Sequence, residues 1–223
     1  MMTLAHSFGR GMARRDLGTG MALFAPLGAD APTESEIVEA LADARFYLRR
    51  DVDADATVTY RLFHQGLTDS LMHMVGPAEV GGGGQSVHGV LLDRLCRDAG
   101  RRPGAATAWA TLASPYLRRH AIDHAVASDR VDELLADGDF LVYADPATLI
   151  RGLPHARTSS GQRAAAVYRT SLRSHHGLDQ DPAVRRSVLM VDAARHQDIA
   201  LGRHLAATSS TARCAQRHPS PLA

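Results

Sequence analysis

Hydrophobic residues along most of the chain recur at three- and four-residue steps, the spacing of amphipathic helices. From Ser86 onwards this spacing forms one stripe through Val87, Val90, Leu91 and Leu95, and another through Leu117, Ala121 and Ala125. Three dipeptides indicate helix starts, because Ser or Asp can cap the first helix amides and Pro suits the first helical position. They are Ser114-Pro115, Asp145-Pro146 and Asp181-Pro182. The pattern predicts further helices over residues 131–136, 147–153, 162–175 and 183–205.

The pattern changes to alternating aromatic and β-branched residues over residues 46–63, on both sides of an Asp-rich turn at residues 51–56. This predicts a β-hairpin. A capping box at Thr33 and Glu36 starts a helix before it, and Leu67, Leu71 and Met74 mark a helix over residues 64–74 after it. We therefore predict a mainly α fold, in which a small winged-helix unit with a β-hairpin is followed by an antiparallel helical-hairpin arm.

Glycine-rich sequence divides the chain. Residues 1–75 are expected to form the winged-helix-like domain, with residues 1–31 as a weakly patterned lead-in. Residues 76–85, which contain Gly81-Gly82-Gly83-Gly84, are expected to be a linker, because glycine repeats do not hold a regular element. Residues 86–206 form the predicted helical arm, and residues 207–223 a disordered tail.

Composition narrows the function classes. The chain has 223 residues, of which 45% are hydrophobic, and a formal net charge of +1. It therefore lacks the strongly basic composition that is typical of nucleic-acid-binding proteins, and its charge indicates no membrane partner. Its two cysteines, Cys96 and Cys214, lie far apart, which favours a reducing compartment over a disulfide framework. We find no signal peptide and no apolar run long enough to span a bilayer, and expect a cytoplasmic location.

All 25 of the Lys and Arg residues are arginine, because the sequence contains no lysine. A Walker A loop, a protein kinase and a pyridoxal-phosphate enzyme each need a lysine. Those three activities are excluded for this chain alone, and we predict that it is not an enzyme and has no catalytic residue.

Three short patterns resemble functional motifs without completing them. Asp51, Asp53 and Asp55 copy the start of an EF-hand loop, but Ala56 and Leu62 stand where the loop needs Gly and Glu, so we interpret the aspartates as solvated turn residues. His120 and His124 are one helical turn apart, but they lack a third metal ligand, which favours a surface or partly buried helical face and predicts no metal site. Ser86 is one residue out of register for a nucleophile elbow, and is expected to be a helix N-cap.

A DNA-binding winged helix would present basic or amide side chains on its recognition helix. The segment considered for that role, residues 64–73, contains no Arg and includes Asp69. Since attraction to phosphates dominates DNA affinity, we expect no nucleic-acid partner.

Residues 43–53 and the segment Tyr60-Arg61-Leu62-Phe63-His64-Gln65-Gly66-Leu67-Thr68-Asp69-Ser70-Leu71 resemble the winged-helix region of STAND-class signalling NTPases, the NACHT and NB-ARC relatives. Many bacterial members continue into WD-repeat propellers. Residues 115–120, 132–137 and 140–146 extend the resemblance into the helical arm of that class, so that it covers roughly residues 15–206.

The resemblance implies that a winged-helix histidine, here His64, contacts the phosphates of ADP or ATP in the resting state. The chain has no cofactor of its own, since the P-loop that would hold the nucleotide belongs to an NTPase module absent from this sequence. The expected function is therefore that of a non-catalytic regulatory and interdomain module of a STAND-type NTPase, in signal transduction. A free-standing helical adaptor for protein partners is the alternative, and a winged-helix transcription regulator is a third hypothesis.

Overall fold

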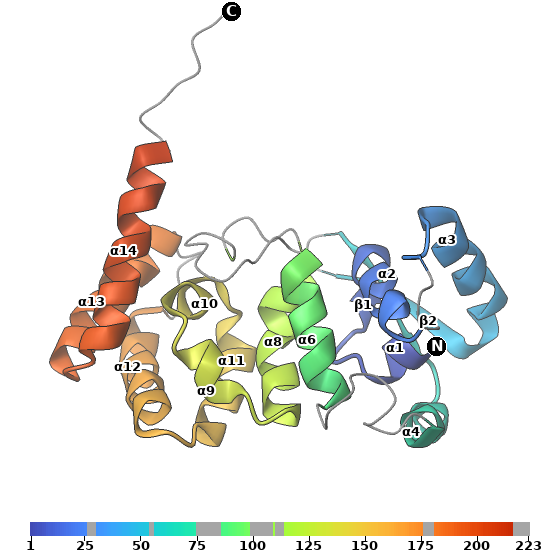
Figure 1. The fold of residues 1–223 in the computed structure, drawn as a ribbon, viewed down its shortest axis with the longest axis horizontal. Coiled ribbons are helices and arrows are strands. Elements are labelled where there is room, and N and C mark those ends of the chain that lie inside the picture. The colour runs from blue at the N-terminus through green and yellow to red at the C-terminus, as the bar shows by residue number, and fades with distance from the viewer. Residues whose placement is uncertain are drawn as a thin grey trace, which may run out of the picture. The chain divides into compact units, whose positions relative to one another are not determined.

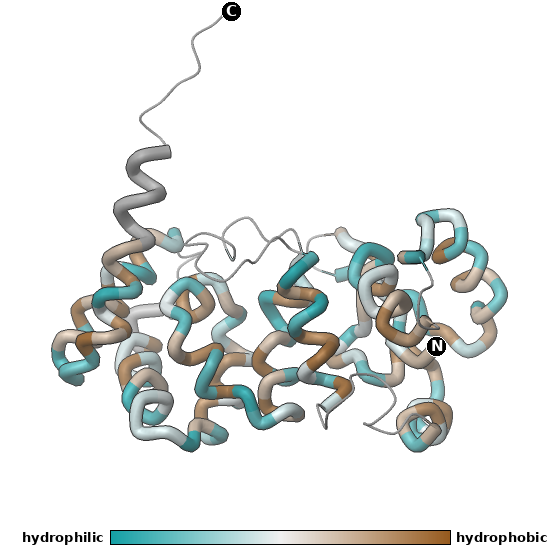
Figure 2. Tube along the Cα trace, viewed as in Figure 1, coloured by the Kyte–Doolittle hydropathy of each residue, from teal (hydrophilic) through white to brown (hydrophobic). Residues whose placement is uncertain are grey.

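The computed structural model describes residues 1–25, 30–53, 56–74, 86–98, 109, 114–175 and 181–215. Helices predominate and are accompanied by a small three-stranded antiparallel sheet, which confirms the predicted mainly α class with a β-hairpin unit (Figure 1). Hydrophobic and hydrophilic positions alternate around the helices, as amphipathic packing requires (Figure 2). None of the helices in the described ranges is long and apolar enough to cross a membrane.

The chain divides into two compact units. The first comprises Met1–Asp98 and Ser114–Ser128, and the second comprises Ala99–Ala113 and Asp129–Ala223. The helices that begin at Val87 and Pro115 therefore belong with the hairpin, although the hydrophobic pattern assigned them to the arm. The predicted linker at residues 76–85 lies outside the described residues.

The elements of the first unit, in chain order, are α1 (Met2–Ala5), β1 (Met12–Ala13), α2 (Arg14–Leu23), α3 (Glu34–Asp43), the 3-10 turn η1 (Arg45–Tyr47), β2 (Leu48–Val52), β3 (Val58–Leu62), α4 (Gln65–Met74), α6 (Val87–Asp98) and α8 (Pro115–Ala127). β3 is the central strand and pairs antiparallel with both β1 and β2. The predicted hairpin is confirmed, with Leu48 opposite Leu62 and Val52 opposite Val58. Its turn closes where the Asp53 amide donates to the Thr57 carbonyl at 2.8 Å.

Residues 1–25, which lie in the weakly patterned lead-in, contribute side chains to the core of the first unit. Leu4, Met12 and Leu17 are buried, on α1, β1 and α2 respectively. A four-residue helix and a two-residue strand are too short to show a hydrophobic period, and their burial depends on contacts with distant elements.

Five helix starts are capped as predicted. The Thr33 hydroxyl accepts from the Glu36 amide while the Glu36 side chain accepts from the Thr33 amide, which completes the capping box. Ser86 accepts from the His88 amide at 3.3 Å, which confirms it as the cap of α6. Side chains also cap the helices that begin with Pro, namely Ser114, Asp145 and Asp181.

The second unit contains α9 (Val131–Leu135), α10 (Gly138–Tyr143), α11 (Pro146–Gly152), the 3-10 turn η2 (Leu153–His155), α12 (Ser159–His175), α13 (Pro182–Arg195) and α14 (Ile199–Ala215). Its core includes the fully buried rings of Trp109 and Phe140, whose centroids are 4.9 Å apart. Buried polar contacts tie its helices together, since the Ser171 hydroxyl donates to Asp192 at 2.9 Å and Arg186 pairs with Asp139 at 2.6 Å.

The single helix predicted over residues 183–205 is two helices. Gln197 adopts a left-handed φ of 56°, which ends α13, and the Asp198 carboxylate accepts from the Leu201 amide at 3.1 Å to start α14. Hydrophobic spacing continues across this break, so the periodicity did not reveal it. α14 extends to Ala215 and thus includes residues 207–215 of the segment predicted as a tail; residues 216–223 are outside the described part of the chain.

Candidate functional site

Four histidines meet inside the first unit with Phe8 and Tyr116, and we call these six residues the histidine cluster. His6 follows α1, His88 lies on α6, and His120 and His124 lie on α8. His124 is completely buried, and His6 and His120 are 5% and 6% exposed. The prediction that His120 and His124 occupy a surface or partly buried face was wrong, because the N-terminal segment covers that face of α8.

Phe8 occupies the centre of the histidine cluster. Its ring centroid lies 4.9 Å from that of His124, 5.3 Å from that of His88 and 6.4 Å from that of His120. His6 packs edge-on to His88 at 5.2 Å, and its other face stacks on Phe24 at 5.8 Å. Aromatic packing of this kind is worth about 0.5–1.5 kcal/mol per pair beyond the area buried.

A hydrogen-bond chain links three of these side chains. The Phe8 amide donates to the Tyr116 hydroxyl at 3.2 Å, the hydroxyl lies 2.8 Å from His124 Nε2, and His124 Nδ1 lies 3.1 Å from His88 Nδ1. Every group has a partner only if Tyr116 donates to His124 Nε2 and His124 Nδ1–H donates to His88. This assignment makes both imidazoles neutral and places the proton of His88 on Nε2.

Burial opposes protonation of three of the histidines, His6, His88 and His124. Desolvation lowers the pKa of His6, and it lowers the pKa of His88 to about 4, with His6 contributing repulsion. The pKa of His124 is well below its ordinary value, first because of desolvation and then because of repulsion from His88, His120 and His6. Burial likewise raises the pKa of Tyr116. At neutral pH the chain of hydrogen bonds is therefore uncharged.

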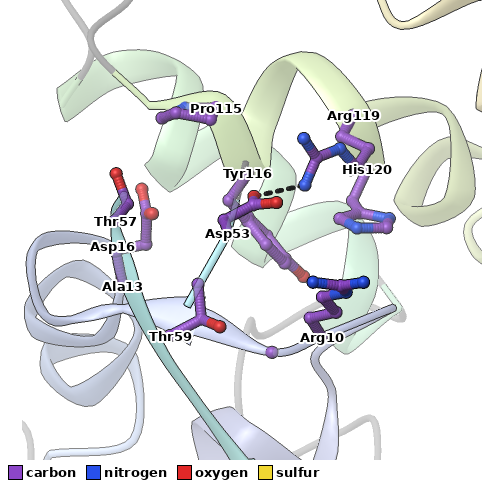
Figure 3. A pocket seen from close by; sticks show the side chains of 11 residues that line it. Arg10, Ala13, Asp16, Asp53, Thr57, Thr59, Pro115, Tyr116, Arg119 and His120 are labelled. Carbon is purple, nitrogen blue, oxygen red and sulfur yellow. Dashed lines mark hydrogen bonds and ion pairs between the residues drawn. The ribbon is translucent and has the colours of Figure 1, made fainter. Parts of the chain in front are cut away.

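A small polar cavity lies beside the cluster (Figure 3). Its volume of about 10 Å³ is enough for one water molecule. Figure 3 shows that Pro115, Tyr116, Arg119 and His120 reach it from α8, while Asp53, Thr57 and Thr59 reach it from the hairpin. The Thr59 hydroxyl is buried there without a hydrogen-bond partner. The space is too small for a metabolite.

Asp53 and Asp16 are the carboxylates of this cavity. Asp53 pairs with Arg119, so the interpretation of this aspartate as a solvated turn residue was wrong; its side chain is 10% exposed. Asp51, whose side chain is 27% exposed, pairs with Arg49 and Arg61, and Asp55 is outside the described residues. Burial raises the pKa of Asp16, opposed by a hydrogen bond from Ser114 and by Arg15.

His64, the residue that the resemblance selects, lies elsewhere in the first unit. It is exposed at the junction of β3 and α4, where its Nδ1 accepts from the Gly66 amide at 3.3 Å. Its carbonyl accepts from the Leu67 and Thr68 amides, so His64 caps α4. With Nδ1 accepting, the neutral ring carries its proton on Nε2.

An exposed aromatic patch adjoins His64. It consists of Phe46, Tyr47 and Phe63, which are 76%, 56% and 67% exposed. The Phe63 amide donates to the Tyr47 carbonyl at 2.8 Å, so these residues continue the hairpin pairing, and the Arg45 guanidinium lies 4.4 Å from the Phe46 ring centroid. Adjacent exposed aromatic rings are typical of interaction surfaces.

Sequence reasoning found only part of the histidine cluster. The four-residue spacing of His120 and His124 was visible, but His6, Phe8 and His88 carried no signal because they come from distant segments. In the described residues, no group of three or more His, Cys, Asp or Glu side chains is placed to hold a metal ion. Comparison with family models, curated proteins and solved structures yields no match to this chain.

Replacing Tyr116 by Phe is expected to lower the free energy of unfolding of the first unit by about 1–3 kcal/mol. The ring is kept, but the Phe8 amide and His124 Nε2 lose their shared partner in a buried site. Urea titration followed by circular dichroism measures the change. Tyr47→Phe removes an exposed hydroxyl and serves as the control, with an expected effect within about 0.5 kcal/mol. Equal effects of the two substitutions would contradict the assigned chain.

Proposed function

We propose that this chain is the winged-helix and helical-arm region of a STAND-type signalling NTPase and acts as a non-catalytic regulatory module. The observation that carries the proposal is the position of His64: an exposed imidazole at a helix N-terminus, with Nε2–H as the donor, beside an exposed aromatic patch. Such a nitrogen can donate to a phosphate oxygen near the positive end of the α4 dipole. The aromatic patch would contact the NTPase module.

The order of elements supports the winged-helix part of the proposal. In a winged helix, a helix, a strand, two helices and a β-hairpin follow one another, and the first strand pairs with the last. The elements α1, β1, α2, α3, β2 and β3 have this order, and β1 pairs with β3. In this arrangement the recognition position of a DNA-binding member falls on α3 rather than on residues 64–73. α3 carries Glu34, Glu36, Glu39 and Asp43, which repel phosphates and disfavour the transcription-regulator hypothesis.

A non-catalytic role is supported by the environment of the polar groups. Burial lowers the pKa of His6, His88 and His124 of the histidine cluster, and the cavity beside the cluster holds no more than a water-sized molecule. The absence of lysine removes the residue that a P-loop would need. Nucleotide would therefore bind to the NTPase module, and His64 would add one contact to it.

The test uses the tagged 223-residue chain, captured from lysate of the organism that encodes it and analysed by mass spectrometry. We expect either a P-loop NTPase as a partner or a longer polypeptide that contains this sequence and a P-loop, in each case with bound ADP. His64→Ala should reduce the co-purifying ADP by roughly tenfold, the value of one hydrogen bond to a charged group. His155→Ala, at an exposed residue of the second unit, is the matched control.

Three results would contradict the proposal. If neither form of P-loop protein were recovered, the link to an NTPase would be contradicted. Unchanged ADP in His64→Ala would contradict the phosphate contact of the histidine. ATP turnover by the chain alone would contradict the non-catalytic assignment.

The adaptor alternative is favoured by one observation in the second unit. An open, mainly apolar groove of about 720 Å³ runs along α13 and α14, where Met190, Ala193 and Ile199 contribute to its lining. A protein partner lost on Ala194→Arg, at an exposed residue of the groove, but kept in His64→Ala would support this alternative.

A further inference from the structure

The N-terminal segment, residues 2–13, is attached to the rest of the first unit by its buried side chains Leu4 and Met12, by the pairing of β1 with β3 and by the histidine cluster. Phe8 is surrounded by rings from α6 and α8, and the Phe8 amide begins the hydrogen-bond chain through Tyr116. Gly9, at a φ of 62°, lies so close to His120 that an added Cβ would be 2.6 Å from Nε2. The segment then pairs with β3 through Met12 and Ala13.

The hydrogen bonds that join Tyr116, His124 and His88 require neutral imidazoles. His124 must accept at Nε2 and donate at Nδ1, and His88 must accept at Nδ1. A second proton on His88 would place two N–H groups against each other across 3.1 Å. Both ring nitrogens of His6 are buried without a hydrogen-bond partner, so a charge on that ring would have no acceptor.

The surrounding charges do not compensate for a proton on these rings. On α8 the Asp123 carboxylate is engaged by His120 at 2.7 Å, and Arg119 is paired with Asp53 of the hairpin. On α2, Asp16 interacts with Ser114 and Arg15. The groups that act electrostatically on His88 and His124 are the other histidines of the cluster, and the Met1 ammonium directly precedes the segment that carries His6.

We propose that the histidine cluster is an acid-sensitive latch, which holds residues 2–13 against α6 and α8 at neutral pH and releases them when His6, His88 and His124 take up protons. Release frees His6 to water and uncovers His88 and His124 on α6 and α8. The latch is independent of the NTPase hypothesis, because it uses only residues of the first unit.

The direction of the pH effect follows from the lowered pKa values of His6, His88 and His124 in the closed form. The open form binds more protons below its ordinary histidine pKa of about 6.5, so the closed form loses stability as the pH falls through that value. For His88 the loss continues down to about pH 4. Each histidine released can raise the opening equilibrium constant by up to about tenfold per pH unit.

Hydrogen exchange measured by mass spectrometry tests the latch between pH 7.5 and pH 5.0, after correction for the intrinsic pH dependence of exchange. We expect exchange in residues 2–13, which include the Phe8 and Gly11 amides, to accelerate by about 10- to 100-fold per pH unit below pH 6.5. Peptides from α6 and α8 should stay protected to lower pH. The latch would be overturned if exchange in residues 2–13 did not accelerate, or if residues 2–13, α6 and α8 accelerated together.

His6→Phe is the decisive variant, because phenylalanine keeps the stacking on Phe24 and removes the buried nitrogens. We expect it to reduce the acceleration by up to about tenfold per pH unit. His73→Gln, at an exposed histidine on α4, should leave it unchanged. An unaltered pH dependence in His6→Phe would overturn the proposal.

A measurement on the wild-type chain covers the case in which His6→Phe does not fold. Nitrogen-15 NMR of the imidazoles at pH 6 should show neutral rings for His88 and His124 in the closed form, protonated on Nε2 and Nδ1 respectively. Charged rings in molecules that still protect residues 2–13 would overturn the latch.

Discussion

Gly11→Ala is expected to destabilise the first unit by about 3–5 kcal/mol, the range in which a buried anchor is lost. Gly11 has a φ of 90°, a region that L residues rarely adopt, and a Cβ there would lie 2.0 Å from the Tyr60 carbonyl oxygen. Because the clash is with backbone, β1 must separate from β3, and Met12 loses its full burial. Urea denaturation followed by circular dichroism at 222 nm measures the effect.

The control for that substitution is Gly66→Ala in the same unit. Gly66 lies on α4, where an added Cβ meets the His64 ring at 3.4 Å, an ordinary contact. Its expected effect is within about 1 kcal/mol, the usual difference between glycine and alanine in a helix. A loss below about 1 kcal/mol for Gly11→Ala would show that the close approach of Gly11 to β3 is not required.

Phe140→Ala is expected to lower the free energy of unfolding of the second unit by about 3–5 kcal/mol. Phe140 is completely buried and packs on Trp109, so its truncation leaves a cavity in the core between the helices of this unit. Trp109 is the single tryptophan, and its emission during urea denaturation therefore reports on this unit. We also expect a change in the native emission spectrum, since the ring next to the indole is removed.

Val191→Ala is the matched control, because Val191 is 52% exposed on α13. Its expected effect is within about 0.5 kcal/mol. If both variants lost the same stability, the core would not be centred on Phe140.

Local chemistry made much of the fold predictable. The side chains of Thr33, Ser86 and Ser114 accept from helix amides only two or three residues further along the chain, so both partners of each cap lie in one short stretch of sequence. The hairpin was predictable for the same reason, since its alternation and its Asp-rich turn are adjacent.

The remaining features depend on contacts that a single segment does not encode. β1 has only two residues, and it became recognisable through its pairing with β3. The break at Gln197 requires one left-handed residue inside an otherwise helical pattern. Asp53 looked like a turn residue because its partner, Arg119, is 66 positions away.

The candidate sites divide in the same way. His64 follows from a local sequence block, and its exposure and capping role are compatible with the predicted phosphate contact, which stays a prediction. The histidine cluster joins residues 6, 8, 88, 116, 120 and 124, and four-residue periodicity revealed only its last two members. Buried sites assembled from several segments require tertiary structure to be found.

The discontinuity of the first unit governs how the protein can be dissected. The chain passes between the units after Asp98, after Ala113 and after Ser128, so no single cut yields both units intact. A fragment ending at Asp98 would lack α8, and one beginning at Ser86 would keep α6 and α8 without the N-terminal segment that covers them. The first truncation would expose Leu91 to solvent, and the second would expose both Leu91 and Leu117. Aggregation or nonspecific adhesion of either fragment in a binding assay would then mimic a partner-binding surface.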